Sequence, residues 1–206
     1  MEELDLLKKD WKKKENSFQQ ISEVAIYKMI HKESSSTVKW ILILSILEVL
    51  IWSIVSIFYN SDEYLIKIHS EYLIQYFQVL TFVNYAVIAI FIYLFYKNYI
   101  SISTTTSTKK LMKAILKTRK TVRNYVWYNL AMIAIGMVIG MALAFNTNPE
   151  IQNMLQNDKV FYLTIAFCIV ALTIVFGLFW LFYRLVYGML LRKLLTNYKE
   201  LKKIDL

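Results

Sequence analysis

The sequence has few of the residues that interrupt long helices. It holds four glycines and one proline among 206 residues, which is too few for a fold with many tight turns. Its one cysteine, Cys168, excludes an internal disulfide and a cysteine-based metal cluster. The single proline, Pro149, falls outside every long apolar run. These shortages favour an all-α chain made of a few long helices.

Residues that could build a catalytic centre are equally scarce. The two histidines, His31 and His69, are predicted to lie on opposite sides of a membrane, so they cannot share a metal or complete a Ser-His-Asp set. No glycine-rich phosphate loop is present. We therefore expect no enzyme activity, no metal and no cofactor.

Apolar residues are abundant and form four long runs. They make up 57% of the chain, and a bilayer core of about 30 Å is crossed by ~20 apolar residues in a helix. The runs predict four transmembrane helices, at residues 40–59, 77–96, 125–145 and 160–183. Aromatic residues near the span ends, among them Trp40, Tyr125 and Tyr183, are interpreted as interface anchors.

Basic residues alternate along the chain in a way that predicts orientation. The segments between and outside the spans hold eight, one, eight, one and six Lys or Arg residues. Basic residues favour the cytoplasmic side, so both termini and the central connection are predicted to be cytoplasmic, in a bacterial inner membrane. The predicted parts are a cytoplasmic segment 1–39, a hairpin 40–97, a connecting helix 98–124, a second hairpin 125–187 and a tail helix 188–206.

The cytoplasmic parts are predicted to form short amphipathic helices. One covers residues 4–15, and another begins at Ser22 and ends at the serines of residues 34–36. The connection and the tail carry apolar stripes (Leu111 and Ile115; Leu194 and Leu201) surrounded by basic residues. They are expected to bind anionic lipids of the inner leaflet or an acidic protein, but not nucleic acid. The basic residues concerned are Lys109, Lys110, Lys113, Lys117, Arg119, Lys120, Arg192 and Lys193.

Two sequence matches suggest an internal duplication. Thr37-Val38-Lys39 resembles Thr121-Val122-Arg123 at an offset of 84, and residues 93–97 resemble residues 180–184 at an offset of 87. Each unit would hold a basic helix and a transmembrane hairpin. Because each unit has two spans, the copies would be parallel.

One carboxylate lies inside a predicted span. A charged Glu48 costs about 2.5–3.5 kcal/mol or more at mid-membrane depth, so we expect it to point into the bundle and to bond to Asn84 or Tyr85. It is either an ion or proton site or a structural hydrogen-bonding group. Ser45 and Asn129 are further polar residues within the membrane.

Small residues recur every four positions in the third span. Gly136, Gly140 and Ala144 form a face of the kind that lets helices approach closely. This face predicts packing inside the bundle, or else a contact between two copies in a homo-oligomer.

Several segments resemble a family of flavobacterial (Bacteroidetes) four-span inner-membrane proteins. The resemblance is carried by residues 26–32, 109–113, 117–122 and 197–203. It implies a membrane-held regulator linked to a sigma factor. The leading hypothesis is therefore a non-enzymatic scaffold or regulator with a cytoplasmic partner. The alternative is a small oligomeric transporter or channel that uses Glu48 and Asn84.

Overall fold

The computed structural model describes residues 22–58, 65–66, 73–147, 151–152 and 158–204. Its four long helices are α2 (Glu23–Phe58), α4 (Ile74–Ser103), α5 (Thr108–Thr147) and α7 (Asp158–Ile204). All four are long and apolar enough to cross a membrane, which confirms the all-α class and the four predicted spans. The helix predicted at residues 4–15 lies outside the described residues.

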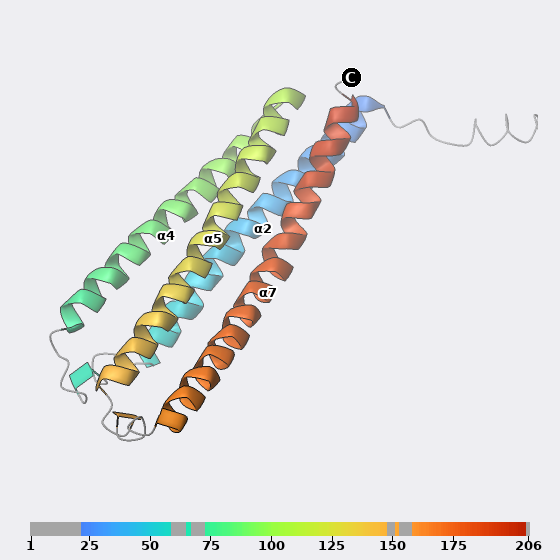
Figure 1. The fold of residues 1–206 in the computed structure, drawn as a ribbon. Coiled ribbons are helices and arrows are strands. Elements are labelled where there is room, and N and C mark those ends of the chain that lie inside the picture. The colour runs from blue at the N-terminus through green and yellow to red at the C-terminus, as the bar shows by residue number, and fades with distance from the viewer. Residues whose placement is uncertain (1–21, 59–64, 67–72, 148–150, 153–157, 205–206) are drawn as a thin grey trace, which may run out of the picture.

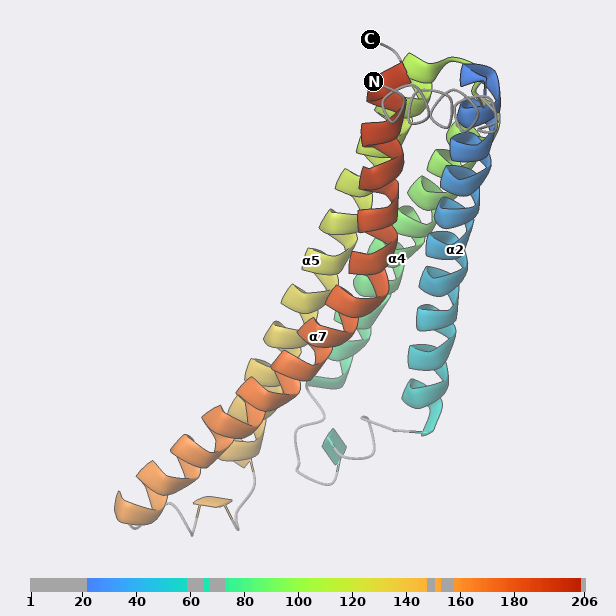
Figure 2. The same cartoon turned by 90° about the vertical axis from the view of Figure 1, so that its right-hand side faces the viewer.

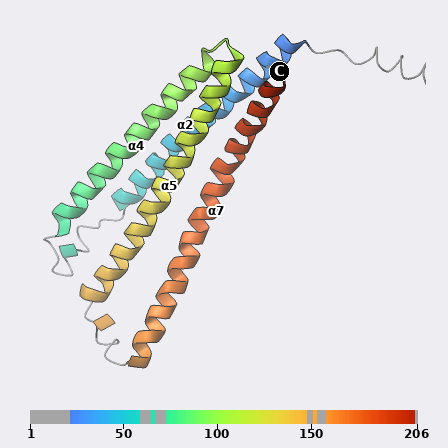
Figure 3. The ribbon, with the colours of Figure 1, turned by 45° about the horizontal axis from the view of Figure 1, so that its top comes forward.

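The helices form a bundle in which sequence neighbours pack side by side. α2 packs on α4, α4 on α5, α5 on α7, and α7 closes the ring on α2. Figures 1 and 3 show that α2 begins, α7 ends and α4 turns into α5 at one end of the bundle. We call it the C-terminal end. Figure 2 shows α2 and α7 moving apart toward the other end.

The helix α2 starts as predicted but does not break at the serines. The Ser22 hydroxyl accepts a bond from the Ala25 N–H at 3.3 Å, as an N-cap does. α2 then continues through residues 34–36. Ser34 is buried, and the Thr37 hydroxyl donates to the Glu33 carbonyl oxygen at 2.8 Å. Hydroxyl groups satisfied in this way are compatible with a continuous helix, so the predicted break is wrong.

The apolar stripes predicted to face lipid are part of the bundle core instead. Leu111, Ile115, Leu194 and Leu201 are fully buried at the C-terminal end. Their helices are not separate short elements, because α5 and α7 run without interruption from this end into the predicted spans. The stripe residues find apolar partners on neighbouring helices, which removes them from any lipid surface.

Burial is concentrated in the half of the bundle near the C-terminal end. Within the described residues, none is buried in 46–58, 74–87, 131–147 or 159–182. Side chains there are nevertheless strongly apolar, and many large ones are exposed. In a membrane such surfaces face lipid tails without a hydrophobic penalty. The molecule therefore has one tightly packed half and one open half.

The predicted close packing of the glycine face is not found. A Cβ atom built on Gly136 or on Gly140 would meet no atom within 4 Å beyond its own helix. Gly140 and Ala144 instead line a gap of about 420 Å³ between α5 and α7. The separation of the helices in the open half leaves these small residues without a close neighbour.

Candidate functional site

Glu48 is held by three tyrosine hydroxyls where the packed half meets the open half. Tyr125 of α5 donates to its Oε2 atom at 2.8 Å, and Tyr187 of α7 donates to the same oxygen at 3.0 Å. Tyr183 of α7 donates to Oε1. One carboxylate thereby joins α2, α5 and α7.

The three tyrosines belong to a buried aromatic layer. Tyr183 and Tyr187 are four residues apart, so they lie on one face of α7, and their ring centroids are 5.9 Å apart. Tyr125 meets Tyr187 edge-on at 5.8 Å and Phe95 at 5.3 Å. This packing fixes the rings and presents their hydroxyls to Glu48.

The layer supplies hydrogen bonds to Glu48 but no positive charge. An ionised carboxylate only accepts hydrogen bonds and has room for about four donors. Its three donors here are neutral hydroxyls. A negative charge in an apolar medium is stabilised best by a cation with a complementary position. An ionised Glu48 would have room for about one further donor beside these three bonds.

Glu48 points into the bundle as predicted, but its predicted partners are wrong. Asn84 accepts a bond from the Tyr128 hydroxyl at 2.9 Å, and the Tyr85 hydroxyl pairs with that of Ser53 at 3.3 Å. Tyr125 and Tyr183, predicted as interface anchors, are buried and bind Glu48. The four-residue spacing of Tyr183 and Tyr187 could have predicted these partners, because it places two hydroxyls on one face of a helix.

The other predicted intramembrane polar groups bond within their own helices. Ser45 donates to the Leu42 carbonyl oxygen at 2.9 Å. The Asn129 amide donates to the Tyr125 carbonyl oxygen at 2.9 Å. Each bond stays within one helix, so neither bond reaches the Glu48 carboxylate.

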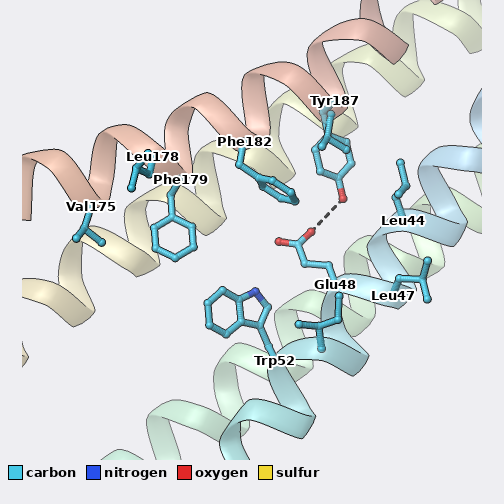
Figure 4. A pocket seen from close by; sticks show the side chains of 11 residues that line it. Leu44, Leu47, Glu48, Trp52, Val175, Leu178, Phe179, Phe182 and Tyr187 are labelled. Carbon is cyan, nitrogen blue, oxygen red and sulfur yellow. Dashed lines mark hydrogen bonds between the residues drawn. The ribbon is translucent and has the colours of Figure 1, made fainter.

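An apolar pocket of about 550 Å³ opens between α2 and α7 beside Glu48. Figure 4 shows the carboxylate at one side of the pocket, bonded to Tyr187, with Trp52 and Phe179 across from it. The side chains of Trp52 and Phe179 are in contact, with ring centroids 5.9 Å apart. The residues that line the pocket come from α2 and α7, two helices that move apart toward the end of the bundle opposite the C-terminal end (Figure 2).

Hydrogen bonds join neighbouring helices at the C-terminal end. Asn197 of α7 donates to the Ser34 hydroxyl of α2 at 3.0 Å, with both residues buried. Asn98 of α4 donates to the Thr121 hydroxyl of α5 at 3.3 Å. The Tyr27 hydroxyl donates to the Thr105 carbonyl oxygen at 3.1 Å, and burial raises the pKa of Tyr27.

A second pocket, of different character, lies at the turn between α4 and α5. Its volume is about 470 Å³, and three lysines and three hydroxyl residues line it together with Ala114. The lysines are Lys110, Lys113 and Lys117, and the hydroxyl residues are Ser101, Thr104 and Thr105. We call it the lysine pocket. Arg119 and Lys120 follow on the same helix, and Lys193 of α7 pairs with Glu33 of α2 at 3.1 Å.

A sequence family described as a domain of unknown function, DUF8845, matches residues 24–206. The chain belongs to this family. The match covers all four helices apart from the first residue of α2. It thus includes Glu48, its three tyrosines and the lysine pocket.

Comparison with curated proteins gave no match, and comparison with solved structures gave none either. The description of DUF8845 states no activity. Function therefore has to be argued from the two pockets and from the charges around them.

Proposed function

We propose that this chain is a non-enzymatic membrane scaffold or regulator that holds an acidic cytoplasmic partner at the lysine pocket. The observation that carries the proposal is the convergence of three lysines and three hydroxyl residues on one hollow. Cationic and hydroxyl donors together suit a carboxylate or phosphate group. The expected ligand group is an acidic side chain, or a phosphorylated one, on the partner.

Helix geometry and local charge both support an anionic ligand. Lys110, Lys113 and Lys117 are three and four residues apart, so they share one face of α5. The pocket lies beside the first turn of α5, where backbone N–H groups favour negative charge. Residues 97–124 include eight basic residues and no acidic one. The Thr105 hydroxyl is shielded from solvent and has no hydrogen-bond partner, so it is free to donate.

The packed half of the bundle would serve as a rigid platform for docking. Its core is continuous across all four helices, and the bond from Asn197 to Ser34 joins its first and last helices. A preorganised surface loses less conformational entropy when it binds. A partner would therefore meet a lysine pocket whose walls are already in place.

The proposal places the C-terminal end in the cytoplasm of a bacterial cell, with the spans in the inner membrane. It is supported by the eight, one, eight, one and six alternation of basic residues along the chain. Lys39, Lys97, Arg123 and Arg184 adjoin the predicted spans. They would then lie near anionic lipid headgroups, each contributing about 1 kcal/mol near the surface. Exposed basic residues not engaged by the partner would serve this anchoring role.

We also propose that the bundle is two tandem hairpins derived by duplication. Three buried positions of α2 have buried counterparts 84 residues later in α5: Ser34 with Thr118, Val38 with Val122, and Ile41 with Tyr125. The offset of 84 residues between these pairs is the same as the offset between Thr37-Val38-Lys39 and Thr121-Val122-Arg123. A shared ancestor would account for both the sequence match and the shared burial.

The partner can be identified by crosslinking inside cells. A photoreactive amino acid at position 113 should capture one cytoplasmic protein in near-equal amount, and a sigma factor is a candidate because of the family resemblance. Changing Lys110 and Lys117 to Glu should abolish the capture. The matched control changes Lys202 and Lys203 to Glu, which are exposed on α7, and should leave it intact. Capture of only lipid and the chain itself would overturn the proposal.

The alternative, a small oligomeric transporter or channel, has its support in Glu48. The carboxylate lies in a predicted span and borders a pocket. Asn84 adds little to this hypothesis, because its amide oxygen is already engaged by Tyr128. Transport would be tested by flux into vesicles with wild-type protein and with Glu48→Gln.

A further inference from the structure

We propose that the pocket between α2 and α7 is a binding site for a cationic amphiphile, with Glu48 as its counter-ion. The ligand class is a molecule with an apolar body and an isolated amine or quaternary ammonium group. This goes beyond a scaffold function, which uses the lysine pocket at the C-terminal end and needs no ligand in the membrane.

The size and lining of the pocket fit such a molecule. A volume of about 550 Å³ is within the range of small-molecule sites, which are mostly apolar with a few polar groups. Here the polar groups are the Glu48 carboxylate, the Tyr187 hydroxyl and the Trp52 indole N–H. The remaining lining residues are apolar, and several are exposed on the surface of the bundle, including Ile51, Leu178 and Phe182. A ligand could enter from the lipid phase.

Charge complementarity selects the headgroup. The three hydrogen bonds to Glu48 come from neutral hydroxyls, so a bound cation would supply the missing positive charge. The aromatic residues Trp52, Phe179 and Phe182 also line the pocket, and aromatic faces attract cations when water is absent. Carboxylate and rings thus favour the same kind of headgroup.

Depth argues against an ordinary phospholipid as the ligand. Glu48 is eight residues beyond Trp40, where the first predicted span begins, so it lies about 12 Å below that interface. A phospholipid keeps its headgroup at the interface, and its phosphate would be repelled by Glu48. A lone cation on an apolar body avoids the phosphate repulsion, and pairing with the Glu48 carboxylate offsets the cost of taking the cation below the interface. The site is therefore assigned to this class.

The test compares two probes of equal chain length in lipid nanodiscs. Labelled dodecyltrimethylammonium should bind the full-length protein saturably, above its partition into protein-free discs, whereas uncharged dodecanol should only partition. Glu48→Gln should weaken binding about thirtyfold or more, the effect expected when one partner of a desolvated charge pair is removed. Equal saturable binding of both probes, or none of either, would overturn the proposal.

A second variant keeps the test decisive if Glu48→Gln does not fold. Leu178→Trp should fill the pocket and abolish saturable binding while leaving the carboxylate and its tyrosines in place. Ile90→Trp is the matched control, because Ile90 of α4 is exposed to a similar extent, 58% against 62%, and does not line the pocket. Unchanged binding to Leu178→Trp, or to folded Glu48→Gln, would contradict the assignment.

Discussion

Asn197 and Ser34 are 163 residues apart in sequence, yet the Asn197 amide donates to the Ser34 hydroxyl at 3.0 Å. Both side chains are almost fully buried. The bond joins α7 to α2 at the C-terminal end of the bundle. A buried polar pair of this kind penalises alternative registers between the two helices, since a shift would leave both groups unpaired.

Removing this bond should destabilise the fold. Asn197→Ala is expected to lower the free energy of unfolding by about 1–2 kcal/mol, because Ser34 loses its partner and a cavity is left. Thr196→Ala is the control, since Thr196 is exposed and bonds only within its own helix. Equilibrium unfolding in bicelles measures both. Equal stability of the two variants would show that the bond contributes nothing.

The apolar stripe of α5 gives a sharper test of the packed half. Ile115 is fully buried and its neighbour Leu116 is 43% exposed. Ile115→Ala should cost about 2–5 kcal/mol because it opens a cavity, whereas Leu116→Ala should change stability by less than about 0.5 kcal/mol. Thermal unfolding of the purified variants distinguishes them. Comparable losses at both positions would mean that the stripe does not face the bundle core.

The tyrosine layer should stabilise the bundle through Glu48. Tyr187→Phe removes one donor and is expected to cost about 1–2 kcal/mol, the range for hydrogen bonds to charged groups and within membranes. In a background of Glu48→Gln the same change should cost less, and a double-mutant cycle isolates the coupling. Tyr85→Phe, which breaks the bond to Ser53, should show no coupling to Glu48.

A larger side chain on the glycine face should be tolerated, whereas at a close helix contact it would be destabilising. Gly140→Ala should be tolerated and should stabilise α5 by about 0.5–1 kcal/mol, because alanine restricts the unfolded backbone and meets no neighbouring atom. Melting temperature and oligomeric state would be measured together. A loss of stability, or of a dimer band, would show that another copy packs on this face.

The Glu48 site illustrates how far sequence reasoning reaches. A carboxylate in an apolar run predicts that the side chain turns inward, and it does. Its partners could not be deduced, because any of several hydroxyl or amide groups at similar depth would satisfy it. Which one comes within hydrogen-bond distance depends on how α5 and α7 are rotated and shifted against α2.

The apolar stripes at the C-terminal end show the same division. Their helical spacing was visible in Leu111, Ile115, Leu194 and Leu201, and it predicted amphipathic helices. An apolar stripe is compatible with a lipid surface, a partner or another helix of the same chain. The bundle uses the third option, because α2, α4, α5 and α7 all continue past the predicted membrane boundary and cover one another.

The sequence by itself determined four long apolar segments and their capacity to span a membrane, as the described residues show. These properties depend on local composition, on run length and on the shortage of glycine and proline. Only the tertiary structure decided which half of the bundle is packed, which tyrosines bind Glu48 and where the two pockets open. The bonds to Glu48 and between Asn197 and Ser34 join residues 70 or more positions apart, and the lysine pocket depends on how α4 turns into α5. Periodicity along one helix does not specify how that helix is rotated against another.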